Sequence, residues 1–234
     1  MRVGVILPSF EPSVDAARSC AAEAEEAGIH GLFAYDHLWP PGTPGRSAIA
    51  PFPLLGMLAA TTERVFLGTL VARIGLVPED VLVAEFRTLN LVSGGRLIAG
   101  IGAGDHRSAP ENLAYGLVPQ SAPARRQAIH TVGAALVGER IPVWIGAGAT
   151  PTNAIAREIG ATINVFGVGV GRVAELGREG AVSWGGVLAR TRASAATQLR
   201  TLADAGATWA VIGWPDSAAP VVEAARVAGI PLGW

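Results

Sequence analysis

The stretch LNLVSGGRLIAGIGAG, residues 89–104, contains the pattern that decides the predicted fold. An amphipathic helical segment ends at Gly94 and Gly95, and a short apolar run then begins and ends in further glycines. A run that is apolar on both faces is typical of a strand buried inside a parallel sheet. The stretch therefore predicts a helix followed by a buried parallel strand, the alternation from which α/β domains are built.

The same alternation recurs along the whole chain. Apolar runs bounded by glycine and proline predict strands at about 3–7, 31–35, 65–71, 96–102, 142–146, 162–166, 182–187 and 209–213. Helical patterns follow them at about 14–27, 52–63, 79–92, 125–138, 151–159, 172–179, 194–205 and 217–228. Eight such units in 234 residues predict a closed (β/α)8 barrel, with an open doubly wound sheet as the alternative. No polar linker divides the chain, so residues 1–234 are expected to form a single domain.

The composition excludes several classes of function. The formal net charge is -1 and the sequence has no run of basic residues, so a nucleic-acid partner is not expected. Lysine is absent, which excludes Schiff-base catalysis and a Walker-type phosphate lysine. Every long apolar segment is interrupted before it could span a membrane, and the first apolar run is too short for a secretory signal. A cytoplasmic protein without membrane contact is expected.

Polar side chains follow the predicted strands at their C-terminal tips, where the active sites of (β/α)8 barrels lie. Asp36 and His37 end the second strand, so one side chain can point inward and the other toward a neighbouring loop. They are interpreted as a hydrogen-bond anchor and a proton donor, and a pair that only staples the loop is the alternative. The first strand ends in LPSF instead of a His-x-His pair, so no catalytic metal is expected.

A glycine-rich tip ends the fourth strand. In GIGAG, residues 100–104, three glycines would let the backbone approach a flat ligand closely and leave Asp105 at the rim. The alternative is packing glycines beside a solvated carboxylate. Residues 103–124 have no regular pattern and are expected to form an irregular loop over the mouth of the barrel.

The sequence PVWIGAGATPTNAIARE, residues 142–158, places a second glycine-rich tip directly before a helix. Thr150 is the expected N-cap and Pro151 the first helical residue. Backbone N–H groups and the helix dipole at such a terminus suit a phosphate, with the hydroxyls of Thr150 and Thr152 assisting. Ordinary helix capping is the alternative. The glycine spacing does not fit a dinucleotide-binding turn.

Four stretches together resemble the bacterial luciferase-like monooxygenase superfamily, in particular its branch that uses the deazaflavin coenzyme F420. They are YDHLW at 35–39, LGTLV at 67–71, LNLVSGGRLIAGIGAG at 89–104 and IPVWIGAG at 141–148. The resemblance extends over nearly the whole chain and implies a luciferase-like barrel that forms homodimers. One departure is a shortened segment before the fifth predicted strand, where family members carry a longer excursion.

The strand tips and the resemblance together assign roles to residues at the mouth. His37 and Asp105 are the expected catalytic residues. The residues expected to bind the cofactor are Asp36, Thr69, Leu70, Val71, Gly102, Gly104, Gly146, Ala147, Gly148, Ala149, Thr150 and Thr152. The substrate pocket is expected to include Ser9, Trp39, His106 and Trp184. The resemblance also implies a non-proline cis peptide near Leu70 and Val71 that supports one ring face.

These expectations lead to three hypotheses of function. The leading one is hydride transfer between coenzyme F420 and a small organic substrate, because the resemblance places the Asp36–His37 pair beside a deazaflavin. The second is an FMN-dependent monooxygenase on the same scaffold. The third is a barrel of the same family that binds a ligand without catalysis, which the shortened segment would allow because lids complete and desolvate such sites.

Overall fold

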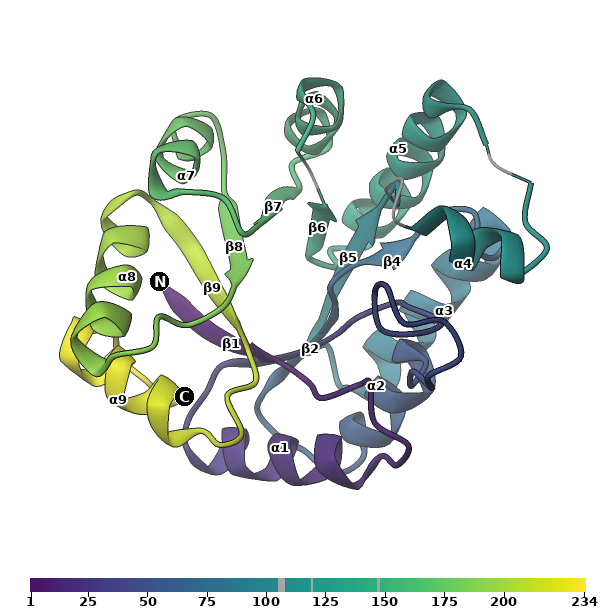
Figure 1. Ribbon diagram of the computed structural model, residues 1–234. Helices are drawn as coiled ribbons and strands as arrows, with labels where there is room; N and C mark the ends of the chain where they lie inside the picture. The colour runs from purple at the N-terminus through teal and green to yellow at the C-terminus, as the bar shows by residue number, and fades with distance from the viewer. Residues whose placement is uncertain (105–107, 119, 147) are drawn as a thin grey trace.

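A computed structural model describes residues 1–104, 108–118, 120–146 and 148–234 of the chain. Parallel strands form one ring, and helices cover its outside (Figure 1). The strands are β1 Arg2–Ile6, β2 Gly31–Ala34, β3 Phe66–Thr69, β4 Ala72–Arg73, β5 Leu97–Gly102, β6 Val143–Gly146, β7 Thr162–Phe166, β8 Val182–Gly186 and β9 Ala207–Gly213. The helices are α1 Asp15–Glu26, α2 Pro51–Ala59, α3 Glu79–Val92, α4 Ala109–Ala114, α5 Ala122–Gly138, α6 Thr150–Glu158, α7 Val170–Gly177, α8 Arg192–Asp204 and α9 Ala219–Ala228.

The ring closes, which confirms the predicted (β/α)8 barrel and rejects the open sheet. The strands are hydrogen-bonded in the order β3-β2-β1-β9-β8-β7-β6-β5-β4, and β3 also pairs with β5. That last pairing joins Leu67 to Leu97 and Gly68 to Ile98. Because β3 and β4 are two pieces of one interrupted strand, the third in the ring, the ring has eight strand positions, and this third strand extends beyond the predicted end at residue 71.

The third strand differs from the prediction of one continuous run over 65–71. Gly68 pairs with Ile98, but Ala72 pairs with Ile101, so this strand has one residue more than its partner over the same span. One extra residue is a β-bulge, which bends a strand and redirects its side chains. The cis peptide between Leu70 and Val71 lies within this bulge and confirms the expected non-proline cis bond.

Two other boundaries need correction. Residues 103–124 are not wholly irregular, because they include the short helix α4, Ala109–Ala114. Helix α6 has Ala149 as its N-cap, in extended backbone at φ -102 and ψ 141, and Thr150 is already helical. Ala149 takes the N-cap place because its carbonyl accepts the N–H groups of Thr152 and Asn153, and its own side chain has no acceptor that could cap the helix.

The strands separate two apolar cores. Side chains that point outward, such as Val3, Val5 and Ile101, pack in the large core beneath the helices. A second cluster fills the inside of the barrel with Ile6, Phe33, Leu70, Ile98, Trp144, Trp209 and Val211. In the part of the chain that the structure describes, none of the helices has the length and apolar character needed to cross a membrane.

Inward-facing glycines make room for the aromatic rings inside the barrel. A Cβ at Gly4 would lie 2.7 Å from Cε2 of Phe33, and one at Gly68 would lie 2.8 Å from Cε1 of the same ring. Phe33 stacks on Trp144 with ring centroids 4.9 Å apart. At the N-terminal end, the Arg2 guanidinium lies 5.6 Å from the ring of Trp209. Aromatic rings therefore fill the lower barrel, and the C-terminal end is the place for a site.

Candidate functional site at the barrel mouth

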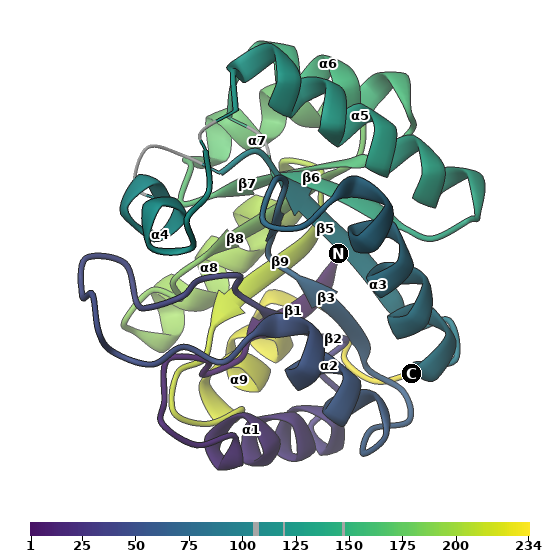
Figure 2. The ribbon, with the colours of Figure 1, turned by 90° about the vertical axis from the view of Figure 1, so that its right-hand side faces the viewer.

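The loops that surround the mouth bring two distant segments to the same end of the barrel. Helix α4 and the segment between β2 and α2 lie at the left edge of Figure 2, whereas the C-terminus lies at the right. The second of these segments includes His37, and α4 includes Glu111. The mouth is therefore formed by the ends of the strands, and α4 contributes side chains such as Glu111 at its edge.

The bulge at Leu70 and Val71 forms an apolar platform that depends on neighbouring glycines. A Cβ at Gly102 would lie 2.6 Å from Cγ2 of Val71, and a Cβ at Gly146 would lie 2.9 Å from the same atom. Both glycines end strands, β5 and β6, so their missing side chains leave space for Val71 across the end of the sheet. The result is a surface of aliphatic groups and bare backbone, which suits one face of a flat ring.

Thr69, an expected cofactor residue, fixes the start of the bulge. Its side chain is fully buried, and its hydroxyl donates a hydrogen bond of 2.6 Å to the carbonyl of Gly100 on β5. The backbone of the third strand leaves the ladder at this point, so the hydroxyl satisfies an oxygen of the neighbouring strand. Thr69 thereby supports the platform from below.

Asp36 fixes the other end of the bulge. Its carboxylate Oδ2 accepts the backbone N–H of Arg73 at 2.8 Å, directly after the bulge. Burial raises the pKa of the Asp36 carboxyl, and the hydrogen bond from the Arg73 N–H, together with the nearby guanidinium, opposes that rise. The geometry agrees with the interpretation of Asp36 as a hydrogen-bond anchor.

His37 is held by a residue that the sequence reasoning missed. Its Nδ1 lies 2.7 Å from Oε1 of Glu111, and Oε2 of the same carboxylate accepts the backbone N–H of Leu38 at 2.8 Å. The Glu111 side chain is only 2% exposed, whereas that of His37 is 25% exposed. A buried carboxylate therefore fixes the imidazole at the edge of the mouth.

Arg73 supplies the positive charge that this buried carboxylate needs. Its Nη2 lies 3.1 Å from Oε2 of Glu111, and its Nη1 donates to Oδ1 of Asn112 at 3.2 Å. The guanidinium is itself only 5% exposed. Arg73 lies directly after the bulge, so one residue joins the platform, Asp36 and the His37–Glu111 pair in a single network.

Glu111 carries a weak signal in the sequence. In SAPENLA, residues 108–114, a proline and then an acidic residue stand where the first turn of a helix begins. That signal can indicate α4, but only the folded chain brings residue 111 beside residue 37.

Aromatic side chains line the mouth beside His37. Phe10 stacks on Tyr35 with ring centroids 5.7 Å apart and planes within 9° of parallel. Tyr35 contacts Phe166 edge to face at 6.4 Å, and the Phe166 side chain is half exposed. Burial raises the pKa of Tyr35 to about 12, so its hydroxyl stays protonated at neutral pH. Among the described residues, the side of the mouth beside His37 is therefore lined by aromatic rings.

The expected phosphate site lies at the start of α6. Gly148, Ala149 and Thr150 are exposed, and Thr152 is half-buried. Because the N-cap residue Ala149 has no side-chain acceptor, it leaves the partial positive charge of the helix dipole at the N-terminal end of α6 uncompensated. Ala147, also expected here, lies outside the described residues.

Of the remaining expected residues, the structure describes Ser9, Trp39 and Gly104 but not the two that follow Gly104. Ser9 is buried at 2% exposure, and its hydroxyl has no hydrogen-bond partner in the described part of the chain. Trp39 is half-buried in the segment after β2, and Gly104 is half-buried after β5. Asp105 and His106 lie outside the residues that the structure describes.

Trp184, expected in the substrate pocket, lies away from the mouth. It belongs to the outer core, is 5% exposed, and donates its indole N–H to the carbonyl of Val168 at 2.9 Å. Side chains alternate along a strand, so the neighbouring Gly185 faces the mouth in its place, with Leu70 3.7 Å from the position of its Cβ.

A family model described as luciferase-like monooxygenase matches residues 1–130. The chain belongs to this family. The matched region contains the bulge, His37 and Glu111, so the network at the mouth lies within the family's part of the chain.

The curated relatives match about half of this chain. An F420-dependent glucose-6-phosphate dehydrogenase of Beutenbergia cavernae is 38% identical over 122 residues, 51% of this chain and 36% of the relative. The enzyme of the same description from Microbacterium testaceum is 35% identical over 127 residues, 50% of this chain and 36% of the relative. The chain thus matches about a third of the length of these relatives.

Solved structures of similar fold cover almost all of this family member. An F420-dependent secondary alcohol dehydrogenase in complex with an F420-acetone adduct has a TM-score of 0.80 at 13% identity, over 97% of this chain and 98% of that one. The oxygenating constituent of 3,6-diketocamphane monooxygenase from Pseudomonas putida, in complex with FMN, has a TM-score of 0.71 at 12% identity, over 99% of this chain and 100% of that one. At these identities the similarity supports the fold.

Proposed function

We propose that the chain transfers a hydride between coenzyme F420 and a small organic substrate. The observation that carries this proposal is the platform of Leu70 and Val71, which lies in one network with the carboxylate-held His37. The relatives that are 38% and 35% identical over half of the chain are described as F420-dependent dehydrogenases, which favours the deazaflavin over other flat cofactors.

The residues at the mouth fit such a coenzyme. We assign one face of the ring to Leu70 and Val71, with the bare backbone of Gly102 and Gly146 beside it. The glycine at 104 and the backbone around Ala147 complete this part of the proposed site. Asp36 and Thr69 belong to it as supports of the bulge, because each bonds to the backbone at one of its ends.

We assign the phosphate of the coenzyme to residues 148–152. The N-cap residue of α6, Ala149, has no side-chain acceptor, and Thr150 and Thr152 add hydroxyl groups there. Backbone N–H groups and the helix dipole favour an anion at such an end by about 0.3–1 kcal/mol for exposed groups.

The protein's own contribution to the reaction is positioning and proton transfer. The coenzyme supplies the redox chemistry, which is the acceptance or donation of a hydride. His37 takes the proton of the substrate hydroxyl during oxidation and returns it during reduction. We assign Asp105 as a second acid at the rim, and Ser9, Trp39 and His106 to the substrate pocket. The apolar rings of Phe10, Tyr35 and Phe166 reduce the water around the reacting atoms.

An FMN-dependent monooxygenase is the second candidate function. The FMN complex from Pseudomonas putida shares the fold, although at 12% identity. Fluorescence titration of the purified chain with F420 and with FMN distinguishes the two. We expect F420 to bind at least about tenfold more tightly, equivalent to 1.4 kcal/mol, and tighter binding of FMN would reverse the assignment. Retained turnover in a His37→Ala variant would show that His37 does not carry the proton, whereas F420 binding without any turnover in the wild type would favour a barrel that binds without catalysis.

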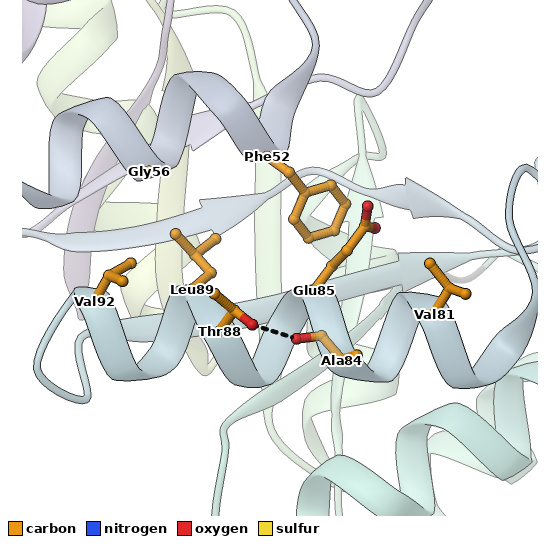
Figure 3. A pocket seen from close by; sticks show the side chains of 8 residues that line it. All are labelled: Phe52, Gly56, Val81, Ala84, Glu85, Thr88, Leu89 and Val92. Carbon is orange, nitrogen blue, oxygen red and sulfur yellow. Dashed lines mark hydrogen bonds between the residues drawn. The ribbon is translucent and has the colours of Figure 1, made fainter.

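We also propose that two copies of the chain form a dimer through α2 and α3. These helices border a groove of about 320 Å³ lined by Phe52, Gly56, Val81, Ala84, Glu85, Thr88, Leu89 and Val92 (Figure 3). Helix α2, with the sequence PFPLLGMLA, has no polar side chain, although only one face packs on the barrel. A helix that is apolar on all sides is normally buried, and a twofold interface would bury it against its own copy.

We further propose that residues 1–234 act as one domain and that the protein is cytoplasmic. The closed ring, which pairs strands from both halves of the chain, supports a single domain. Cys20 is buried and is the single cysteine of the sequence, so the fold does not depend on an oxidising compartment for an internal disulfide.

A further inference from the structure

We propose that Glu111 is a positioning residue that fixes the tautomer of His37, so that Nδ1 carries the ring proton and Nε2 is the nitrogen that exchanges a proton at the mouth. Its consequence for catalysis rests on the function proposed above. The tautomer itself is a property of the protein alone and can be measured without coenzyme or substrate.

The first step is the charge state of Glu111. Its oxygen Oε2 accepts the N–H of Leu38 at 2.8 Å and lies 3.1 Å from the Arg73 guanidinium. Both partners can only donate, so a proton on Oε2 would have no acceptor. A carboxylate buried to 2% exposure beside a cation is retained in its ionised form by that pairing.

The second step is the direction of the hydrogen bond to His37. An ionised carboxylate can only accept, and Oε1 of Glu111 lies 2.7 Å from Nδ1. Nδ1 must therefore carry a proton and donate it, and in the neutral ring Nε2 is left with its lone pair. Nε2 forms no hydrogen bond to any residue that the structure describes, and the side chain is 25% exposed.

The third step is the reaction that this tautomer permits. In the oxidation of an alcohol, Nε2 would accept the hydroxyl proton and a carbonyl group would form as the carbon–hydrogen bond broke; coenzyme F420, when bound, would supply the acceptor for the hydride. The resulting imidazolium stays hydrogen-bonded to Glu111 through Nδ1 and is stabilised by the carboxylate charge. The opposite tautomer would present an N–H group to the alcohol and could not accept its proton.

A second histidine of the chain, His30, has the opposite tautomer and can serve as a reference in the same spectrum. Nδ1 of His30 accepts the backbone N–H of Val3 at 3.2 Å, so the ring proton of His30 must be on Nε2. Burial lowers the pKa of His30, which keeps this ring neutral at neutral pH. One spectrum therefore contains His30 as the Nε2–H pattern and His37 as the Nδ1–H pattern.

Substitution Glu111→Gln is expected to reverse the tautomer of His37. The amide oxygen will take the place of Oε2, because the Leu38 N–H donates to that position and the Arg73 guanidinium lies 3.1 Å from it. The amide nitrogen then faces His37 Nδ1 and donates to it, which forces Nδ1 to accept and moves the ring proton to Nε2. A residue that merely filled space would not cause this exchange.

The test is ¹⁵N NMR of the full chain with labelled histidine, at a pH where the imidazole rings are neutral. The spectra should show His37 as Nδ1–H in the wild type and as Nε2–H in Glu111→Gln, now matching His30. Glu158→Gln is the control, because it alters the exposed partner of His130, whose Nε2 lies 3.3 Å from Glu158, and should leave His37 unchanged. His37 as Nε2–H in the wild type, or an unchanged tautomer in folded Glu111→Gln, overturns the proposal.

The wild-type spectrum tests the predicted Nδ1–H tautomer of His37 even if Glu111→Gln does not fold. With F420 and an alcohol present, the folded variant should lose about 10²- to 10⁴-fold in kcat with little change in KM. If the tautomer switches but the wild type turns over no substrate, the proposed function fails and the role of Glu111 stands.

Discussion

Val71 reaches so close to Gly102 that a Cβ on residue 102 would lie 2.6 Å from its Cγ2. The contact joins the bulge of the third strand to the end of β5, and it requires glycine at 102. Substitution Gly102→Ala should displace Val71, lower the free energy of unfolding by about 1–3 kcal/mol and weaken F420 binding. Urea unfolding and fluorescence titration measure the two effects.

The same pair offers a rescue and a control. The double variant Gly102→Ala with Val71→Ala removes the clashing methyl groups and should recover most of the lost stability. Gly138→Ala adds a Cβ with no neighbour within 4 Å and should leave both stability and binding near those of the wild type. A single Gly102→Ala variant that binds F420 normally would show that the platform does not depend on this contact.

Arg73 should be needed for stability because it is the counter-ion of Glu111. Substitution Arg73→Met leaves the buried carboxylate without its cation, 3.1 Å away in the wild type, and should cost about 3–5 kcal/mol. Adding Glu111→Gln removes the unpaired charge, so the double variant should lose less than Arg73→Met alone. Arg18→Met, at the exposed pair with Asp15, is the control and should barely change the urea midpoint. Additive losses at 73 and 111 would contradict the pairing.

Asp36 should affect stability in two separable ways. Asp36→Ala leaves the Arg73 N–H without its acceptor and should cost about 1–3 kcal/mol, whereas Asp36→Asn keeps an acceptor oxygen. Burial raises the pKa of Asp36 in the folded chain, so its contribution to stability is present below the unfolded pKa of about 3.9 and is lost as the pH rises through the folded pKa.

The sign of that effect can be measured with the asparagine variant. Because an asparagine side chain cannot ionise, the stability of Asp36→Asn relative to the wild type should improve as the pH rises from about 4 to 7. Urea unfolding of both proteins at several pH values gives the difference directly. A difference that is constant, or that falls with rising pH, would show that burial does not dominate at this carboxyl.

The proposed dimer should depend on the groove between α2 and α3. Val81 lines that groove and is 44% exposed, so Val81→Asp should place a charge in the interface and yield a monomer in sedimentation velocity. Val227 on α9 is similarly exposed, at 40%, and Val227→Asp should remain dimeric. A monomeric wild type, or a dimeric Val81→Asp variant, would exclude this interface.

The strands and most helices could be predicted because their signals are local. Strand β7, Thr162–Phe166, and helix α3, Glu79–Val92, agree with the predicted bounds residue by residue. Buried parallel strands are apolar throughout and glycine ends many of the helical patterns, so the local sequence pattern separates these elements.

The details of the mouth could not be predicted, because they depend on contacts between distant segments. Helix α4, Ala109–Ala114, is too short for a periodic pattern, and Glu111 meets His37 across 74 positions of sequence. The resemblance predicted the cis bond near Leu70, but the register of the bulge depends on pairing with β5. Trp184 shows the effect of alternation, since a shift of one position decides which side of the strand a side chain occupies.

A crystal structure of the chain with F420 tests the proposed site most directly. The deazaflavin ring should lie against Leu70 and Val71 within reach of His37, with the phosphate at residues 148–152. A ring bound elsewhere on the barrel, or a mouth that stays empty at saturating F420, would contradict the assignment of this site.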